Sequence, residues 1–138
     1  MESNLKNVVK IFYEEVWNKN NIQIVSEILD EKLTFRGSIG EIKIGHSGFI
    51  EYQALITKSL KNYKCKILEL IEEGNKISAK MEFSGLHVAD FLGYKPTNKE
   101  IIWVGVAIFT FNKNKINDIW VLGDLTNLCS QLSGEENA

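Results

Sequence analysis

The chain has 138 residues, and its composition, 44% hydrophobic and 25% charged, is typical of one globular domain. Sixteen basic and 18 acidic residues leave a net charge of −2, which gives no reason to expect a nucleic-acid partner. The first residues lack the apolar stretch of a signal peptide, and no apolar run approaches the roughly 20 residues that a membrane-spanning helix needs. We therefore expect a cytoplasmic protein that does not contact a membrane.

Apolar residues at helical spacing and two short strand patterns make up the first half of the chain. The expected elements are, in order, a helix from about Ser3 to Trp17, a shorter helix with Ile24, Val25, Ile28 and Leu29, strands at Leu33–Phe35 and Ile42–Ile44, and a helix that starts at His46 and carries Phe49, Tyr52, Ile56 and Leu60. The polar segment Asn18–Asn21 separates the first two helices, and the glycine-bearing turn Gly37–Gly40 separates the two strands.

The second half of the chain reads as a series of long strands followed by one helix. The strands are expected at Tyr63–Glu72, Lys76–His87, Ile101–Phe111 and Lys115–Gly123, and the helix carries Leu125, Leu128 and Leu132. Helices followed by a run of long strands indicate the α+β class, with a curved antiparallel sheet wrapped over the N-terminal helices. We expect one domain over residues 1–132 and a flexible tail over residues 133–138.

The strand Ile101–Phe111 is apolar on both of its faces, so each face needs a cover. On one face Gly105 and Ala107 are small enough to leave room for a ligand or a close neighbour. The other face, with Val104 and Val106, would remain exposed on a single chain. The sequence therefore predicts a homodimer, or a higher homo-oligomer, formed through the sheet.

The small residues on the first face predict an internal apolar cavity that binds a small hydrophobic molecule. Its expected lining is Trp103, Gly105, Ala107, Phe109, Ile119, Val121, Met81, Phe83 and Tyr52. Packing in the core is the equally plausible alternative for Trp103, and a cone filled by side chains would have no cavity at all. Tyr13 and Tyr52 lie on or beside helical apolar faces, where packing in the core is the default expectation, although a phenol that reaches a cavity could orient a carbonyl group.

Three segments together resemble a known family. The segment GLHVADFLGYKPT, residues 85–97, is similar to a loop with glycine, histidine, phenylalanine, glycine, proline and threonine at matching places. A long apolar strand follows it, and then the segment NKNKINDIWVLGDL with Trp120 and Asp124. In this order and spacing the segments resemble the SnoaL-like polyketide cyclase (ester cyclase) family. The resemblance covers nearly the whole chain.

The resemblance implies a cone-shaped α+β barrel, as in ketosteroid isomerase and scytalone dehydratase, with an apolar cavity, no cofactor and a homodimer formed by the sheet. Within the loop, Ala89 stands where a glycine is usual and Lys95 where a first proline is usual. The aldol cyclases of this family place a catalytic aspartate and a histidine on the last two strands, where this chain has Val121 and Ala107. Neither of these side chains can transfer a proton.

Two other residues could supply an acid or a base. His87 ends the inward face of its strand, although a histidine bonded to the loop backbone is the competing interpretation. Asp124 precedes the last helix, and we favour a helix cap over a catalytic role for it. Neither histidine has a ligand set around it that predicts a metal site, and Cys65 and Cys129 are expected to be reduced. The sequence thus leaves two functions open, a cofactor-free cyclase-like enzyme and a non-catalytic binding or dimerisation module.

Overall fold

The structure is a computed structural model, and it describes residues 4–134. The helical elements are α1 (Asn4–Ile11), η1 (Phe12–Trp17), η2 (Ile22–Ile24), α2 (Val25–Ile28), α3 (Gly45–Ser59) and α4 (Leu125–Leu132). The strands are β1 (Leu29–Arg36), β2 (Ile42–Ile44), β3 (Leu60–Glu73), β4 (Lys76–His87), β5 (Glu100–Asn112) and β6 (Lys115–Gly123). Every element expected from the sequence is present, with ends that differ by a few residues, and residues 1–3 and 135–138 lie outside the described part.

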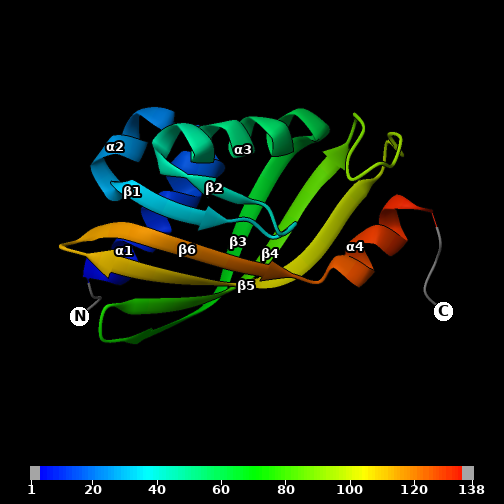
Figure 1. Ribbon diagram of the computed structural model, residues 1–138. Helices are drawn as coiled ribbons and strands as arrows, with labels where there is room; N and C mark the ends of the chain where they lie inside the picture. Colours follow the sequence, from blue (N-terminus) through cyan, green and yellow to red (C-terminus); the bar gives the residue numbers. More distant parts are fainter. Residues whose placement is uncertain (1–3, 135–138) are drawn as a thin grey trace.

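The six strands form one sheet in the order β2-β1-β6-β5-β4-β3, shown in Figure 1. The α+β class and the curved sheet over N-terminal helices are confirmed. The expectation of an all-antiparallel sheet is wrong in one place, because β1 pairs with β6 in parallel. These two strands are far apart in the chain. Turn residues in a sequence indicate only which consecutive strands pair as antiparallel hairpins, so they could not predict this parallel pair. Among the described strands β2 and β3 remain edges, so the sheet does not close into a barrel.

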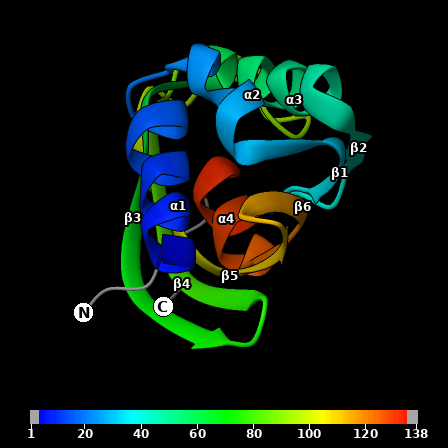
Figure 2. The ribbon, with the colours of Figure 1, turned by 90° about the vertical axis from the view of Figure 1, so that its left-hand side faces the viewer.

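The sheet curls around a core that the N-terminal helices complete. Figure 2 shows β3 and β4 on one side, β1 and β2 on the other, and α1, α2 and α3 over the concave face between them. The largest fully buried side chains are aromatic and aliphatic and come from both the helices and the strands, including Phe12, Phe49, Trp103 and Phe109. Leu29 and Leu60, expected on helices, instead begin β1 and β3, where both are fully buried.

The first helix changes its geometry after Ile11. Residues Phe12–Trp17 form a π-helix, in which the amide of Asn18 donates to the carbonyl of Tyr13 at 2.9 Å. The wider turn places two pairs of neighbouring residues on the core side, namely Phe12, Tyr13, Val16 and Trp17, and all four are buried. The side chain of Gln53 on α3 donates to the carbonyl of Val16. Wide helical turns of this kind often occur at functional sites.

A β-bulge in β3 determines which of its side chains point inward. Lys61 pairs with Leu86 and Lys64 with Ser84, so β3 carries one extra residue, and Asn62 there has a φ of 56°. The bulge places Tyr63 and Cys65 on the buried side, as Leu60 is. The side chain of Asn18 then holds Cys65 in both directions. Asn18 Nδ2 donates to its carbonyl at 3.0 Å, and its amide donates to Asn18 Oδ1 at 2.7 Å.

The inner and outer faces of β5 and β6 differ as the sequence predicts. Trp103, Ala107 and Phe109 are buried on the inner face of β5. On the outer face, apolar side chains are between 38% and 51% exposed, namely Ile102, Val104, Val106, Trp120 and Leu122. Along residues 4–134, no helix is long and apolar enough to cross a membrane.

Candidate functional site

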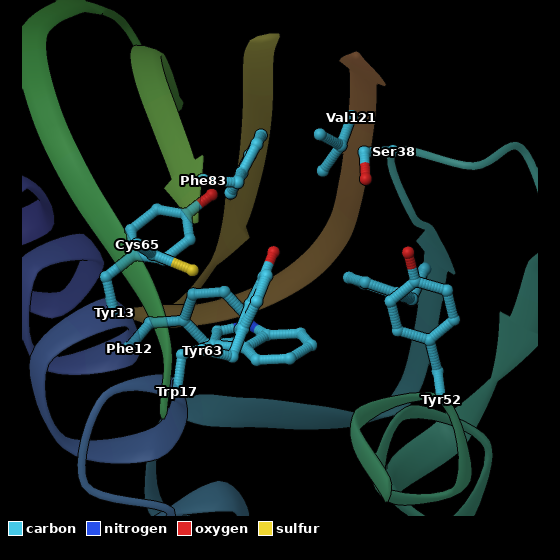
Figure 3. A pocket seen from close by; sticks show the side chains of 10 residues that line it. Phe12, Tyr13, Trp17, Ser38, Tyr52, Tyr63, Cys65, Phe83 and Val121 are labelled. Carbon is cyan, nitrogen blue, oxygen red and sulfur yellow. The ribbon is translucent and has the colours of Figure 1, made fainter. Parts of the chain in front are cut away.

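A cavity lies inside the curled sheet, between η1, α3 and four of the strands (Figure 3). Its lining is mostly aromatic and consists of Phe12, Tyr13, Trp17, Phe35, Ser38, Tyr52, Tyr63, Cys65, Phe83 and Val121. The enclosed cavity volume is about 20 Å³, and the empty space is about 280 Å³ when the open mouth is included. The enclosed volume holds about one water molecule, so a larger occupant requires the lining side chains to shift.

Three of the predicted lining residues do line this cavity, namely Tyr52, Phe83 and Val121. The other predicted residues belong to the packed core or to its edge. Phe109, for example, makes edge contacts with the rings of Phe12 and Tyr13, at centroid distances of 5.6 and 5.7 Å. Phe12 and Tyr13 of η1 therefore separate Phe109 from the cavity that they line.

Sequence reasoning missed six of the lining residues: Phe12, Trp17, Phe35, Ser38, Tyr63 and Cys65. A signal for two of them was present, because Tyr63 and Cys65 alternate with Lys64 and Lys66, as expected for a strand with one buried face. The aromatic residues of η1 could not be placed from a regular helical spacing, since the π-helix changes that spacing. Ser38 lies in the turn after β1, where no alternating pattern indicates whether a side chain points inward.

The ionisable groups in the cavity are held in their neutral forms. Burial raises the pKa of Tyr13 and of Tyr63 well above the usual value. Burial also raises the pKa of Tyr52 to about 12 and keeps the Cys65 thiol protonated by raising its pKa. Among the described residues that line the cavity, none is a carboxylate, a histidine, a lysine or an arginine. The cavity therefore offers neutral hydrogen-bond donors in an apolar setting.

Tyr52 is the phenol with the most defined setting. Its oxygen has a hydrogen bond with the side chain of Ser38 and another with the backbone of Ile39, and both bonds lower the phenol pKa against the larger effect of burial. These bonds favour the charged form of the phenol, but the effect of burial is larger and the pKa stays raised. The ring lies against Gly37, where any Cβ would collide with its Cζ and Oη atoms.

His87 lies outside the cavity lining and at the base of the loop between β4 and β5. It is fully buried, and its Nδ1 accepts from the amide of Thr97 at 3.1 Å. The backbone of His87 also bonds to the loop, through the carbonyl of Lys99 and the amide of Asn98. This is the loop-anchoring arrangement that was the competing interpretation of His87. A catalytic role for it stays a prediction.

Asp124 is the N-cap of α4, as expected, and its Oδ1 accepts from the amide of Asn127 at 3.1 Å. It does not line the cavity either.

The second histidine, His46, bonds through Nε2 to the carbonyl of Leu29 at 2.8 Å. Within residues 4–134, no group of three or more histidine, cysteine or acidic residues could hold a metal ion.

Comparisons with known proteins agree on one family. A family model described as SnoaL-like polyketide cyclase matches residues 7–132. A candidate polyketide cyclase from Acidithiobacillus ferrooxidans is 21% identical, with 99% of each chain covered and a TM-score of 0.85. TsrD from Streptomyces laurentii is 18% identical, with 99% of this chain and 98% of that chain covered and a TM-score of 0.83. For a SnoaL-like polyketide cyclase from Agrobacterium tumefaciens the identity is 15%, the coverage 96% and 99%, and the TM-score 0.79. The comparison with curated proteins gave no match.

Proposed function

Because the chain belongs to the SnoaL-like polyketide cyclase family, we propose that it binds a small, largely apolar molecule in the cavity between η1, α3 and the sheet. The observation that carries this proposal is the presence of three phenol groups, from Tyr13, Tyr52 and Tyr63, in one uncharged aromatic cavity. Pockets for small molecules are mostly apolar and contain a few polar groups that orient the ligand. The occupant is held by packing against aromatic rings and oriented by neutral donors.

Binding without turnover is the form of this proposal that the geometry supports best. Aldol cyclisation and enolisation need a base within hydrogen-bond reach of a carbon acid. The raised pKa values of Tyr52 and Cys65 prevent both groups from accepting a proton at neutral pH. Val121 lines the cavity at the position where the sequence comparison expects the catalytic aspartate of the aldol cyclases.

A cyclase-like enzyme is the second candidate, and family membership is what favours it. The solved structures that resemble this chain include proteins described as polyketide cyclases. Molecules with several carbonyl groups are therefore the first compounds to test for turnover. His87 and Asp124 remain the predicted acid or base for that case, and the reaction would be cofactor-free and would occur in the cytoplasm.

The proposal can be tested by mass spectrometry. The purified protein is denatured, and the small molecules that it releases are identified. A titration with indanone, a compact bicyclic ketone, tests it independently of what co-purifies. Val121→Phe fills the cavity and should abolish indanone binding. Val88→Phe makes the same change in an exposed loop residue and should leave it intact. A parent protein that carries no small molecule and does not bind indanone would overturn the proposal.

A further inference from the structure

The indole nitrogen of Trp103 is a buried donor without an acceptor. Trp103 lies on the inner face of β5 and is 1% exposed. Its Nε1 has no hydrogen-bond partner among residues 4–134. An indole N–H can only donate, and a buried donor left unpaired is destabilising. Buried tryptophans normally have a partner for this group, so the unpaired N–H of Trp103 requires an explanation.

Trp103 does not itself line the cavity, but its ring packs against two residues that do. Its ring lies 5.5 Å from the ring of Phe83 and 6.1 Å from that of Tyr63, and both of these residues line the cavity. A Cβ added to Gly123 would lie 3.1 Å from Trp103 Nε1 and 3.0 Å from Ser38 Cβ. The indole nitrogen and Ser38 thus both lie next to Gly123, and Ser38 is a lining residue.

Two glycines keep this end of the cavity open to the ring atoms. Gly105 on β5 pairs with Gly123 on β6, and a Cβ on Gly105 would lie 3.1 Å from a ring carbon of Phe83. Side chains at either glycine would push Phe83 or Trp103 away from the sheet. The pair therefore lets the indole edge approach Ser38, whose side chain has a hydrogen bond with the hydroxyl of Tyr52.

We propose that Trp103 Nε1–H donates a hydrogen bond to an acceptor oxygen of the ligand, at the end of the cavity formed by β5, β6 and Ser38. This inference rests on the proposed function and adds the class of ligand to it. The ligand has a compact apolar body and, at one end, a carbonyl oxygen or a similar neutral acceptor. Tyr52, whose hydroxyl group is bonded to Ser38, lines the same cavity.

The test compares indanone with indane, the hydrocarbon of nearly the same shape that lacks the oxygen. A site built around a hydrogen bond discriminates against the analogue that cannot form it. Trp103→Phe removes the N–H and should reduce the preference for indanone over indane by about tenfold. Trp17→Phe is the matched control, because it makes the same change at the other indole beside the cavity. It should weaken both probes equally and leave the ratio unchanged.

A proton–nitrogen correlation spectrum gives a second readout that does not depend on affinity. The three tryptophans give three indole signals, and single Trp→Phe variants assign them. Indanone should move the Trp103 indole proton downfield, and indane at the same occupancy should not. Equal binding of both probes with an unmoved Trp103 signal would overturn this inference and leave the proposed function standing. Binding of neither probe would overturn both.

Discussion

Tyr13, Tyr52 and Tyr63 reach the cavity from three different elements, and the apolar atoms around them determine what their hydroxyl groups can do. Burial raises all three pKa values above the usual range for tyrosine. Each hydroxyl therefore keeps its proton at neutral pH. Tyr63 has a hydrogen bond with the side chain of Cys65, which also raises the Tyr63 pKa.

Binding of indanone should not depend on pH between about 5 and 9, because the raised pKa values keep the phenols neutral over that range.

The free energy of unfolding, in contrast, should depend on pH in alkali. The pKa of Tyr52 is about 12 in the folded chain, above its ordinary value near 10 in the unfolded chain, so the stability it contributes is complete below the unfolded pKa. It should fall as the pH rises from about 10 to about 12. Titrations and denaturation curves at each pH measure the two quantities. A bell-shaped binding profile near neutrality would instead place a titrating base in the cavity.

His87→Gln should lower the melting temperature, because the amide of Thr97 loses the ring nitrogen that accepts its hydrogen bond. Removing the partner of a buried donor costs about 1–3 kcal/mol. Affinity for indanone should change little, since His87 does not line the cavity. Thermal unfolding and a titration of the same variant check both statements. An unchanged melting temperature together with lost turnover of a carbonyl substrate would identify His87 as the base instead.

At the scale of elements, two local irregularities shape the cavity. The π-helix η1 brings Phe12, Tyr13 and Trp17 to the cavity, and the bulge at Asn62 brings Tyr63 and Cys65 there. The side chain of Asn18 joins these two features, because it follows η1 and bonds to the backbone of Cys65 on β3. The position of one cavity wall relative to the other depends on this contact.

Asn18→Asp should destabilise the chain, because a carboxylate can accept from the amide of Cys65 but cannot donate to its carbonyl. The expected loss in the free energy of unfolding is about 1–3 kcal/mol, measured by urea denaturation. Asn7→Asp is the control, since Asn7 is exposed on α1. Equal effects of the two substitutions would contradict the role given to Asn18.

Much of this fold could be predicted because its signals are periodic. The alternation along β4 and the apolar run of β5 indicate which faces are buried, and Asp124 before an apolar repeat indicates a cap. The π-helix rotates the side chains that follow it by part of a turn, and the bulge moves the following residues of the strand to the opposite face. A periodic sequence pattern does not reveal either change. The cavity wall formed by η1 was missed for this reason. Tyr63 and Cys65 of β3 do alternate with lysines, and Val121 and Phe83, which line the cavity, lie on regular stretches of strand.

At the scale of the molecule, the outer face of the sheet is the feature that a single chain leaves unexplained. Val106 pairs with Leu122 and Ile108 with Trp120, so the exposed apolar side chains of β5 and β6 are contiguous. Soluble monomers rarely expose such patches unless they bind something. We propose that a second copy of the chain covers this face through a two-fold axis. Lys80 and Glu82 of β4, paired with Val106 and Val104, provide opposite charges beside the patch.

Sedimentation equilibrium at micromolar concentration should give the mass of a dimer or of a multiple of it. Val104→Lys should shift the equilibrium to monomer, because it places two like charges near the two-fold axis in an apolar interface. Leu55→Lys is the control, since Leu55 is an exposed apolar residue of α3 and not of the sheet. It should leave the dimer intact. A monomeric parent protein would show that something other than a second copy covers the patch.

The most direct test of the cavity as a binding site is to locate a bound probe. Nuclear magnetic resonance measures this location as proton–proton contacts between indanone and the protein. Contacts are expected from indanone to the methyl groups of Val121 and to the ring protons of Tyr63 and Phe83, which surround the cavity. None is expected to Val104, which lies on the outer face of the same sheet. Contacts to Val104 alone, or none at saturating indanone, would contradict a binding site inside the curled sheet.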